Sequence, residues 1–268
     1  MSRNLPSYNK GFTLIELAVV LVIVALVAGG IVMAREMIRN AQMQQALAEY
    51  DRYVKAVGEF QEKYNQLPGD FTGATTMWGS DTCPTNAVSS PKRETCNGNG
   101  SGQIGTSDDD GNTDPDHEEW WRAWQHLANS GLIEGLYSGT EGSGGSMEAT
   151  VGTNVPASKV PSAGWTLLYY LNVTTDASLW GDTYGHVLYF GASTAGGGKP
   201  TKGTAITPAE ALGIDQKMDD GYPGTGKIRA WRSGAMANCT ENDTAQTSAT
   251  YKTSNSNMVC SLIFIPGF

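Results

Sequence analysis

The chain is poor in basic side chains. Its 18 Lys and Arg stand against 27 Asp and Glu, so the formal charge is −9. Nucleic-acid binding needs Lys and Arg gathered where they can neutralise phosphates. This composition therefore argues against a direct nucleic-acid site.

Motifs for catalysis are also lacking. The three histidines are His117, His126 and His186, and neither H-E-x-x-H nor G-x-S-x-G occurs. Residues 221–227 satisfy G-x-x-x-x-G-K, but Ile228 stands where a phosphate-binding loop needs Ser or Thr for the metal ion. We interpret that match as chance, assign no catalytic residue, and expect the protein not to be an enzyme.

Proline is absent from residue 7 to residue 67, and a long apolar stretch lies within this window. Residues 12–34 read FTLIELAVVLVIVALVAGGIVMA and hold one ionisable group, Glu16. As an α-helix these 23 residues measure about 35 Å, enough to cross a bilayer core of roughly 30 Å. A secretory signal peptide has a shorter apolar region and a small-residue cleavage site. The stretch therefore predicts a membrane span.

Beyond the span, the helical pattern continues as one apolar face. Apolar residues recur at helical spacing until a break at residues 67–70, Leu-Pro-Gly-Asp. The expected stripe consists of Ile38, Leu47, Tyr50, Val54, Val57, Phe60 and Tyr64. The pattern predicts one helix over residues 12–64, about 80 Å long, whose second half needs a globular domain to cover the stripe.

The four cysteines form no C-x-x-C motif, which argues against a zinc ribbon or a redox pair. Cys83, Cys96, Cys239 and Cys260 all follow the span. An even number in a loop-rich region predicts two disulfides and an oxidising compartment. Of three possible pairings we favour Cys83–Cys96 and Cys239–Cys260, because each closes a short loop; the alternative is four buried free thiols. Lys and Arg are balanced on the two flanks of the span, so the cysteines decide that the large part is extracytoplasmic.

The junction before the span resembles a known processing site. Residues 10–16, Lys-Gly-Phe-Thr-Leu-Ile-Glu, are similar to the cleavage and methylation segment of type IV prepilins and type II secretion pseudopilins. The resemblance implies that a membrane prepilin peptidase cuts between Gly11 and Phe12 and methylates the new terminal amine. Glu16 then becomes the fifth mature residue, where the family has its glutamate. A weaker resemblance links residues 214–226 to the C-terminal region of large prepilin-like proteins.

The resemblance also implies partners and a location. Other pilin or pseudopilin subunits would be the assembly partners. The precursor would lie in the bacterial inner membrane, and the product in a periplasmic or extracellular filament. The chain lacks the proline that often kinks the family's helix, so we expect no kink. Its length exceeds that of typical major pilins, which favours a minor pilin or a large pseudopilin.

Glu16 has a physical reason to act in assembly. A charge about one turn into a membrane helix costs a few kcal/mol unless it is paired. The new ammonium of Phe12 on a neighbouring subunit would supply a partner. The alternative is an acid near the interface whose side chain reaches water. We favour the assembly role.

The remainder of the chain predicts short elements joined by loops. Residues 71–107 and 140–160 are expected to be loop. Asp114 and Pro115 are expected to open a helix that ends at residues 130–131. A tryptophan stripe could be a ligand platform, but core packing is the commoner outcome. The side chains expected to be buried from that helix are Trp120, Trp124 and Leu127.

Further elements follow from local signals. Thr207 and Glu210 form a capping-box pattern that predicts a helix through about Lys217. Aromatic and apolar runs between turn residues predict strands at 165–173, 186–192, 227–231 and 257–265, the last carrying Cys260.

One acidic stretch has the spacing of a calcium loop. Positions 1, 3, 5, 7, 9 and 12 of residues 108–119 carry Asp108, Asp110, Asn112, Asp114, Asp116 and Glu119, and hard oxygen ligands suit Ca²⁺. Thr113 stands where the sharp turn needs Gly, and no helix precedes the loop. The alternative is a solvated acidic loop in which Asp114 caps the next helix. Calcium is the one cofactor that the sequence suggests.

The expected fold is α+β: a long N-terminal helix packed on an antiparallel β-sheet head with disulfide-stapled loops, as in pilins. The expected parts are a leader at 1–11, a helix at 12–64 that spans the membrane at 12–34, and an extracytoplasmic head at 65–268. The expected function is a structural subunit of a type IV pilus-like or type II secretion filament. The alternatives are a single-span binding module, such as a calcium-dependent adhesin that does not polymerise, and an anchored hydrolase.

Overall fold

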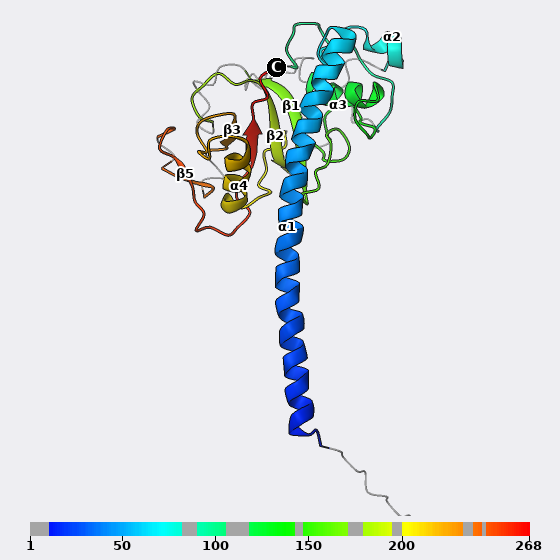
Figure 1. Ribbon diagram of the computed structural model, residues 1–268. Helices are drawn as coiled ribbons and strands as arrows, with labels where there is room; N and C mark the ends of the chain where they lie inside the picture. The colour runs from blue at the N-terminus through cyan, green and yellow to red at the C-terminus, as the bar shows by residue number, and fades with distance from the viewer. Residues whose placement is uncertain are drawn as a thin grey trace, which may run out of the picture. The chain divides into compact units, whose positions relative to one another are not determined.

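The structure is a computed structural model. It describes residues 11–81, 90–105, 118–142, 147–170, 179–194, 200–232, 238–242 and 245–268. The chain divides into two compact units, Met1–Gln42 and Met43–Phe268, and each is described by itself. Helix α1, Leu14–Tyr64, begins in the first unit and ends in the second (Figure 1).

The part of α1 in the first unit is exposed. Its large apolar side chains from Leu14 to Ile38 are each at least half accessible to solvent. No proline or capping residue interrupts the helix, and the expectation of an unbroken helix ending at Tyr64 is confirmed. Ile38, which we had expected in the buried stripe, is 59% exposed.

The part of α1 in the second unit is amphipathic, and its inner face belongs to the core. The buried residues recur every three or four positions and are Met43, Ala46, Glu49, Tyr53, Ala56, Val57 and Phe60. Leu47, Tyr50, Val54 and Tyr64 are partly buried against the same core. The predicted stripe is thus confirmed from Leu47 onward. The buried face also includes four residues that were not predicted: Met43, Ala46, Tyr53 and Ala56.

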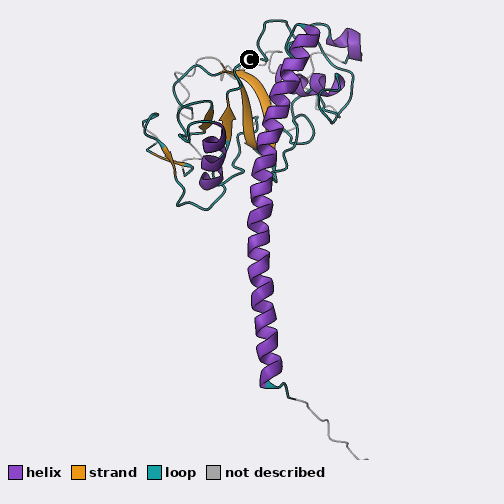
Figure 2. Ribbon diagram, viewed as in Figure 1, coloured by secondary structure: helices purple, strands orange, loops and turns teal. Residues whose placement is uncertain are grey.

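The second unit is built on an antiparallel sheet of four strands in the order β1-β2-β6-β3 (orange in Figure 2). The strands are β1 Ala163–Tyr170, β2 Gly185–Ala192, β3 Ile228–Ala230 and β6 Leu262–Phe264. All four predicted strands are present. The last two are shorter than expected, and Cys260 lies before β6 rather than in it, in an isolated bridge to Ile206. The α+β architecture is confirmed.

One face of the sheet packs on α1 through aromatic rings. Register places Trp165 opposite Phe190, and their ring centroids are 4.7 Å apart. From α1, Tyr50 lies 4.8 Å from Phe264 and Tyr53 lies 6.0 Å from Trp165, centroid to centroid. Aromatic pairs at these distances add attraction beyond the area they bury. The helix is therefore an integral part of the core.

The second unit has three shorter helices: α2 Ala74–Trp78, α3 Glu118–Asn129 and α4 Pro208–Met218. The start of α3 was predicted at residues 114–115, which lie outside the described residues. Its predicted end is confirmed, because Gly131 has a positive φ of 78° and Leu132 N–H donates to the carbonyl of Leu127, as in a Schellman motif. Trp120, Trp124 and Leu127 are fully buried.

The capping box of α4 is also confirmed. The Glu210 N–H donates to the Thr207 hydroxyl at 3.3 Å, and the Thr207 N–H donates to the Glu210 carboxylate at 2.8 Å. The sequence did not indicate α2 or the small hairpin of β4, Thr240–Glu241, and β5, Thr250–Tyr251. Elements of two to five residues leave too short a pattern to recognise.

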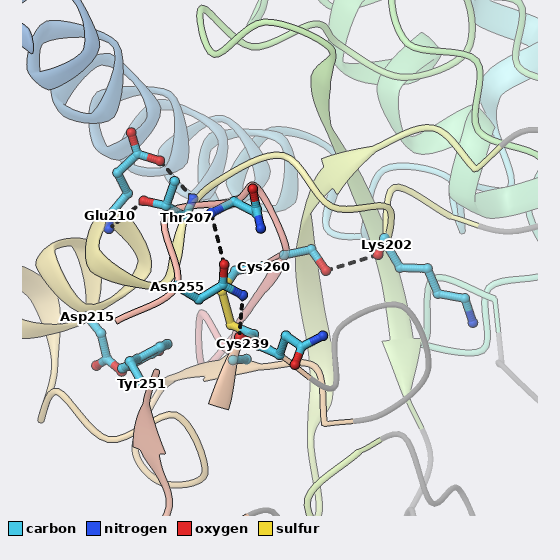
Figure 3. The surroundings of a disulfide bond; sticks show 12 residues. Lys202, Thr207, Glu210, Asp215, Cys239, Tyr251, Asn255 and Cys260 are labelled. Carbon is cyan, nitrogen blue, oxygen red and sulfur yellow. Dashed lines mark hydrogen bonds between the residues drawn. A yellow bond between two sulfur atoms is a disulfide. The ribbon is translucent and has the colours of Figure 1, made fainter. Parts of the chain in front are cut away.

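The disulfide Cys239–Cys260 joins the segment before β4 to the segment before β6 (Figure 3). It closes a separation of 21 residues and fixes the hairpin of β4 and β5 to the sheet. This half of the predicted pairing is confirmed. Cys83 lies outside the described residues, so the Cys83–Cys96 pair stays a prediction; none of the described cysteines is a free thiol.

Candidate functional site

The N-terminal end of α1 is capped by the side chains of Thr13 and Glu16. Residues 11–13 are not helical, and the Leu17 N–H donates to the carbonyl of Thr13 at 3.2 Å. The backbone N–H and the hydroxyl of Thr13 both donate to Oε2 of Glu16, at 2.8 and 2.7 Å. The Glu16 N–H donates back to the Thr13 hydroxyl at 3.3 Å. These reciprocal bonds form a capping box.

The capping box aims the Glu16 carboxylate at the N-terminal end of the helix. Both Thr13 donors use Oε2, and Oε1 forms no hydrogen bond to any residue in the described ranges. The carboxylate is exposed, so one oxygen is available to a donor from another molecule. Sequence reasoning assigned Glu16 to such a partner and missed its local bond to Thr13. The signal was present, because T-x-x-E is the capping-box pattern.

The surface around Glu16 is apolar on all sides. Phe12, Leu14 and Ile15 are 85%, 92% and 72% exposed, and the valines and leucines that follow are each more than half exposed. A helix apolar all round is suited to lipid or to other helices rather than to water. By length and composition α1 can cross a membrane, and none of its most apolar window is buried.

The proposed calcium ligands fall mostly outside the described residues. Asp108, Asp110, Asn112, Asp114 and Asp116 lie in the undescribed segment 106–117. Glu119 is described, on α3, and is buried. Its Oε1 accepts the N–H of Asn99 and its Oε2 accepts the N–H of Gly105, each at 2.9 Å. Calcium binding at residues 108–119 stays a prediction.

The described histidines are structural. His126 is fully buried; its Nδ1 accepts the N–H of Gly69 at 3.0 Å, and its Nε2 faces the Thr95 hydroxyl at 3.1 Å. Burial lowers the pKa of His126 to about 3. The Nε2 of His186 accepts the N–H of Ile104, and burial lowers the pKa of His186. His117 lies outside the described residues.

A carboxylate cluster lies at the end of α4, which the sequence analysis did not single out. Asp215, Asp219 and Asp220 each offer an oxygen within 4.8 Å of the others. Burial raises the pKa of Asp215 to about 7, against hydrogen bonds from the Tyr251 hydroxyl and the Gly221 N–H that lower it. Figure 3 shows Asp215 and Tyr251 side by side. The spacing i, i+4, i+5 was the available signal.

The same cluster explains the loop that resembles a phosphate-binding motif. The backbone N–H groups of Lys227 and Ile228 both donate to Oδ2 of Asp219. These amide groups therefore bind a carboxylate of their own chain. Residue 228 begins β3, whereas a phosphate-binding loop leads into a helix. The geometry agrees with a chance match.

Comparison with known proteins identifies one segment. Residues 6–32 match the model of the prokaryotic N-terminal methylation motif, the prepilin-type cleavage and methylation segment of type IV pilins and pseudopilins. The resemblance inferred from residues 10–16 is therefore confirmed. No curated protein and no solved structure matches the chain. The motif indicates a structural protein and a membrane-anchored precursor.

Proposed function

We propose that the chain is the precursor of a minor or large pilin-like subunit, cut between Gly11 and Phe12 and assembled into a filament through α1. The observation that carries the proposal is the placement of Glu16. It is the one acid in the apolar stretch 12–34, it lies within the methylation motif, and one of its oxygens is available.

The processing step fits the local structure. Residues 11–13 precede the helix, so the proposed scissile bond lies in non-helical chain. Prepilin peptidase would release residues 1–11 and methylate the amine of Phe12. The mature chain would then begin with an ammonium group two residues before α1.

The assembly step follows from the charge on that ammonium. An ion pair at about 4 Å gains on the order of 4 kcal/mol at an effective dielectric near 20, before desolvation is subtracted. Desolvation consumes much of this gain, but leaving a buried charge without its partner costs about 3–5 kcal/mol. An incoming subunit would therefore join about a hundredfold less readily where Glu16 lacks its charge.

The location follows from the span and the disulfide. The segment 12–34 would anchor the precursor in the bacterial inner membrane. The disulfide Cys239–Cys260 suits an oxidising compartment, so the second unit would be extracytoplasmic. The proposed parts are a removed leader at 1–11, the helix at 12–64 and a head.

Two variants distinguish the hydrogen bonds between Thr13 and Glu16 from the negative charge of Glu16. Glu16→Gln keeps a capping-box side chain but loses the charge, whereas Thr13→Ala weakens the cap and keeps the charge. We expect the Gln variant to be processed and inserted but depleted about a hundredfold from sheared filaments or secretion complexes. We expect the Ala variant to assemble.

N-terminal sequencing and intact mass give the second readout. The mature wild-type chain should begin at a methylated Phe12, and Gly11→Val should leave precursor in the membrane. A functional form that begins at Met1 would overturn the processing step. A Gln variant that enters filaments at the wild-type level would overturn the assembly role of Glu16.

A further inference from the structure

A short strap of chain lies against α4 in the second unit. The strap is residues 239–252, described at 239–242 and 245–252, and it contains β4 and β5. These two strands form a small sheet of their own, separate from the four-stranded sheet. Strand β5 is in contact with α4. The strap therefore covers part of α4 without belonging to the main sheet.

The strap is fastened at its two ends by bonds of different kinds (Figure 3). At its start, the disulfide Cys239–Cys260 ties it to the segment before β6. Near its end, the hydroxyl of Tyr251 donates to Oδ2 of Asp215 on α4 at 2.8 Å. The first bond is covalent, whereas the surroundings of the second change when Asp215 gains or loses a charge.

The end of the strap lies over a carboxyl group with no accessible surface. Asp215 is fully buried, and oxygens of Asp219 and Asp220 lie within 4.8 Å of one of its own. In the described part of the chain, none of these three acids forms an ion pair with a cation. Burial and like charges both disfavour the ionised form of an acid. A closed strap and a charged Asp215 therefore oppose each other.

The strap and α1 bring phenols to this cluster. Burial, and then the charge of Asp215, raises the pKa of Tyr251 on the strap. Burial, followed by the charges of Asp51 and Asp219, raises the pKa of Tyr50 on α1 to about 12. Both phenols therefore keep their protons at neutral pH and add no positive charge.

The basic side chains of the neighbouring segments are directed elsewhere. Arg229 on β3 forms its ion pair with Asp182 at 2.7 Å, and Lys217 and Lys227 are exposed. An ionised Asp215 under the closed strap thus has hydrogen bonds but no cation among the described residues. It reaches water when the strap moves away.

We propose that the strap is hinged at the Cys239–Cys260 disulfide, is closed over a protonated Asp215, and opens when Asp215 loses its proton. The inference goes beyond the proposed function, because it concerns the second unit alone. It holds whether or not the chain assembles into a filament.

The direction of the pH response follows from proton linkage. Asp215 has a pKa of about 7 while the strap is closed, and its pKa returns toward the ordinary 3.8 when the strap is open. Opening therefore releases a proton between these two pH values. The equilibrium constant for opening should rise by up to about tenfold per pH unit from pH 4 to pH 7 and level off above pH 7.

Native-state hydrogen exchange of the full chain in detergent micelles tests the strap. The protection factor of an amide reports its opening equilibrium, and a hairpin this small is not stable once detached, so its own amides report the opening. The reporter peptide is 245–252, in which the Lys252 N–H donates to the carbonyl of Cys239 at 2.9 Å. We expect its protection factor to fall at least about tenfold between pH 5 and pH 7.

Three variants assign the response to Asp215. Asp215→Asn cannot ionise and should give a protection factor that is independent of pH. Glu241→Gln removes an exposed acid from the strap itself and should keep the wild-type profile. Tyr251→Phe removes a hydrogen bond that lowers the pKa of Asp215, so the pH at which protection levels off should move upward. A residue that acts through packing alone would not shift that pH.

The hinge has its own test. Replacing Cys239 and Cys260 with serine should lower the protection of peptide 245–252 at pH 5 as well, where the wild-type strap is closed. Unchanged protection at pH 5 would overturn the hinge.

Several outcomes would overturn the proton control. These are a wild-type protection factor that is equal at pH 5 and pH 7, and an Asp215→Asn variant that keeps the wild-type pH dependence. Equal protection of peptide 245–252 and of β2, residues 185–192, would show that the strap opens only when the whole second unit unfolds. Added Ca²⁺ that restores the pH 5 protection at pH 8 would assign the three acids to a cation instead of a proton, and the proposal would be wrong.

Discussion

Two buried carboxylates, Glu49 and Asp215, are held by neutral donors rather than by cations. Glu49 on α1 accepts the N–H of Lys159 and the indole N–H of Trp165, each at 2.9 Å. Asp215 on α4 accepts the N–H of Gly221 at 3.0 Å and the hydroxyl of Tyr251 at 2.8 Å. Each carboxylate joins two elements, so these polar residues act in the core as connectors.

Removing Glu49 should destabilise the second unit. Glu49→Ala leaves the buried indole N–H of Trp165 and the partly buried N–H of Lys159 without their acceptor. A buried donor that loses its acceptor costs about 1–3 kcal/mol. We expect a loss of about 2–5 kcal/mol in the free energy of unfolding, measured by urea denaturation. Glu59→Ala removes an exposed acid from the same helix and should stay within about 0.5 kcal/mol of the wild type. Equal midpoints for the two variants would contradict the connecting role of Glu49.

Asp215 should make stability depend on pH. Its pKa is about 7 in the folded protein and near the ordinary value of 3.8 in the unfolded chain, so the folded state holds a proton that the unfolded state releases. Its contribution to stability is greatest below pH 4 and is lost as the pH rises through 7. Asp215→Asn mimics the protonated acid. The melting temperature of this variant minus that of the wild type should be larger at pH 8 than at pH 5. Each kcal/mol of unfolding free energy that the wild type loses corresponds to about 2–4 °C.

Comparing the Asp215→Asn variant with the wild type separates the effect of Asp215 from that of the histidines, which change stability with pH in the opposite direction. Burial lowers the pKa values of His126 and His186, so both residues reduce stability as the pH falls. They are common to both proteins and cancel in the difference. A melting-temperature difference that is independent of pH would show that Asp215 titrates as an ordinary surface acid.

At the scale of elements, local chemistry made some boundaries predictable. The C-terminal end of α3 followed from the Ser-Gly pair at 130–131, and the start of α4 followed from the Thr207–Glu210 box, since each signal acts within one turn of helix. Strands β1 and β2 followed from aromatic and apolar runs. By contrast, β3 and β6 came out shorter than their runs, because pairing in the sheet decides where a strand ends.

The buried acids could not be predicted in this way. In the sequence, Glu49 and Asp215 have the pattern of polar residues that face solvent. Their roles as hydrogen-bond acceptors depend on Lys159 and Tyr251, which are distant in sequence. The candidate site was more accessible to sequence reasoning, since Gly11, Phe12 and Glu16 lie within six residues of one another. Even there, the Thr13 bond to Glu16 was missed.

The disulfide should matter most for the hairpin of β4 and β5. These two-residue strands contribute little pairing of their own, and Cys239–Cys260 ties their loop to the sheet. Replacing both cysteines with serine should cost about 2–4 kcal/mol. Thiol labelling in denaturant, without reductant, should modify no cysteine of the wild type. Four reactive thiols would place the second unit in a reducing compartment.

At the scale of the whole molecule, the helix and the head cannot be divided at residue 65. Tyr53, Val57 and Phe60 are buried core residues, and α1 covers one face of the sheet. We expect residues 43–268 to be soluble and to unfold cooperatively. Residues 65–268 should expose the sheet and lack a cooperative transition, as circular dichroism during heating would show. A cooperative transition in the shorter chain would mean that α1 is dispensable to the core.

The capping box at Thr13 and Glu16 bears on what the peptidase encounters. The box closes the helix with donors and acceptors that all lie on the C-terminal side of the proposed cut. Removing residues 1–11 would therefore leave all the bonds of the capping box in place. The enzyme would cut next to residues 11–13, which are not helical, and would not have to unwind α1. The precursor and the mature subunit would then share one helix boundary, and processing would change charge at that boundary without changing shape.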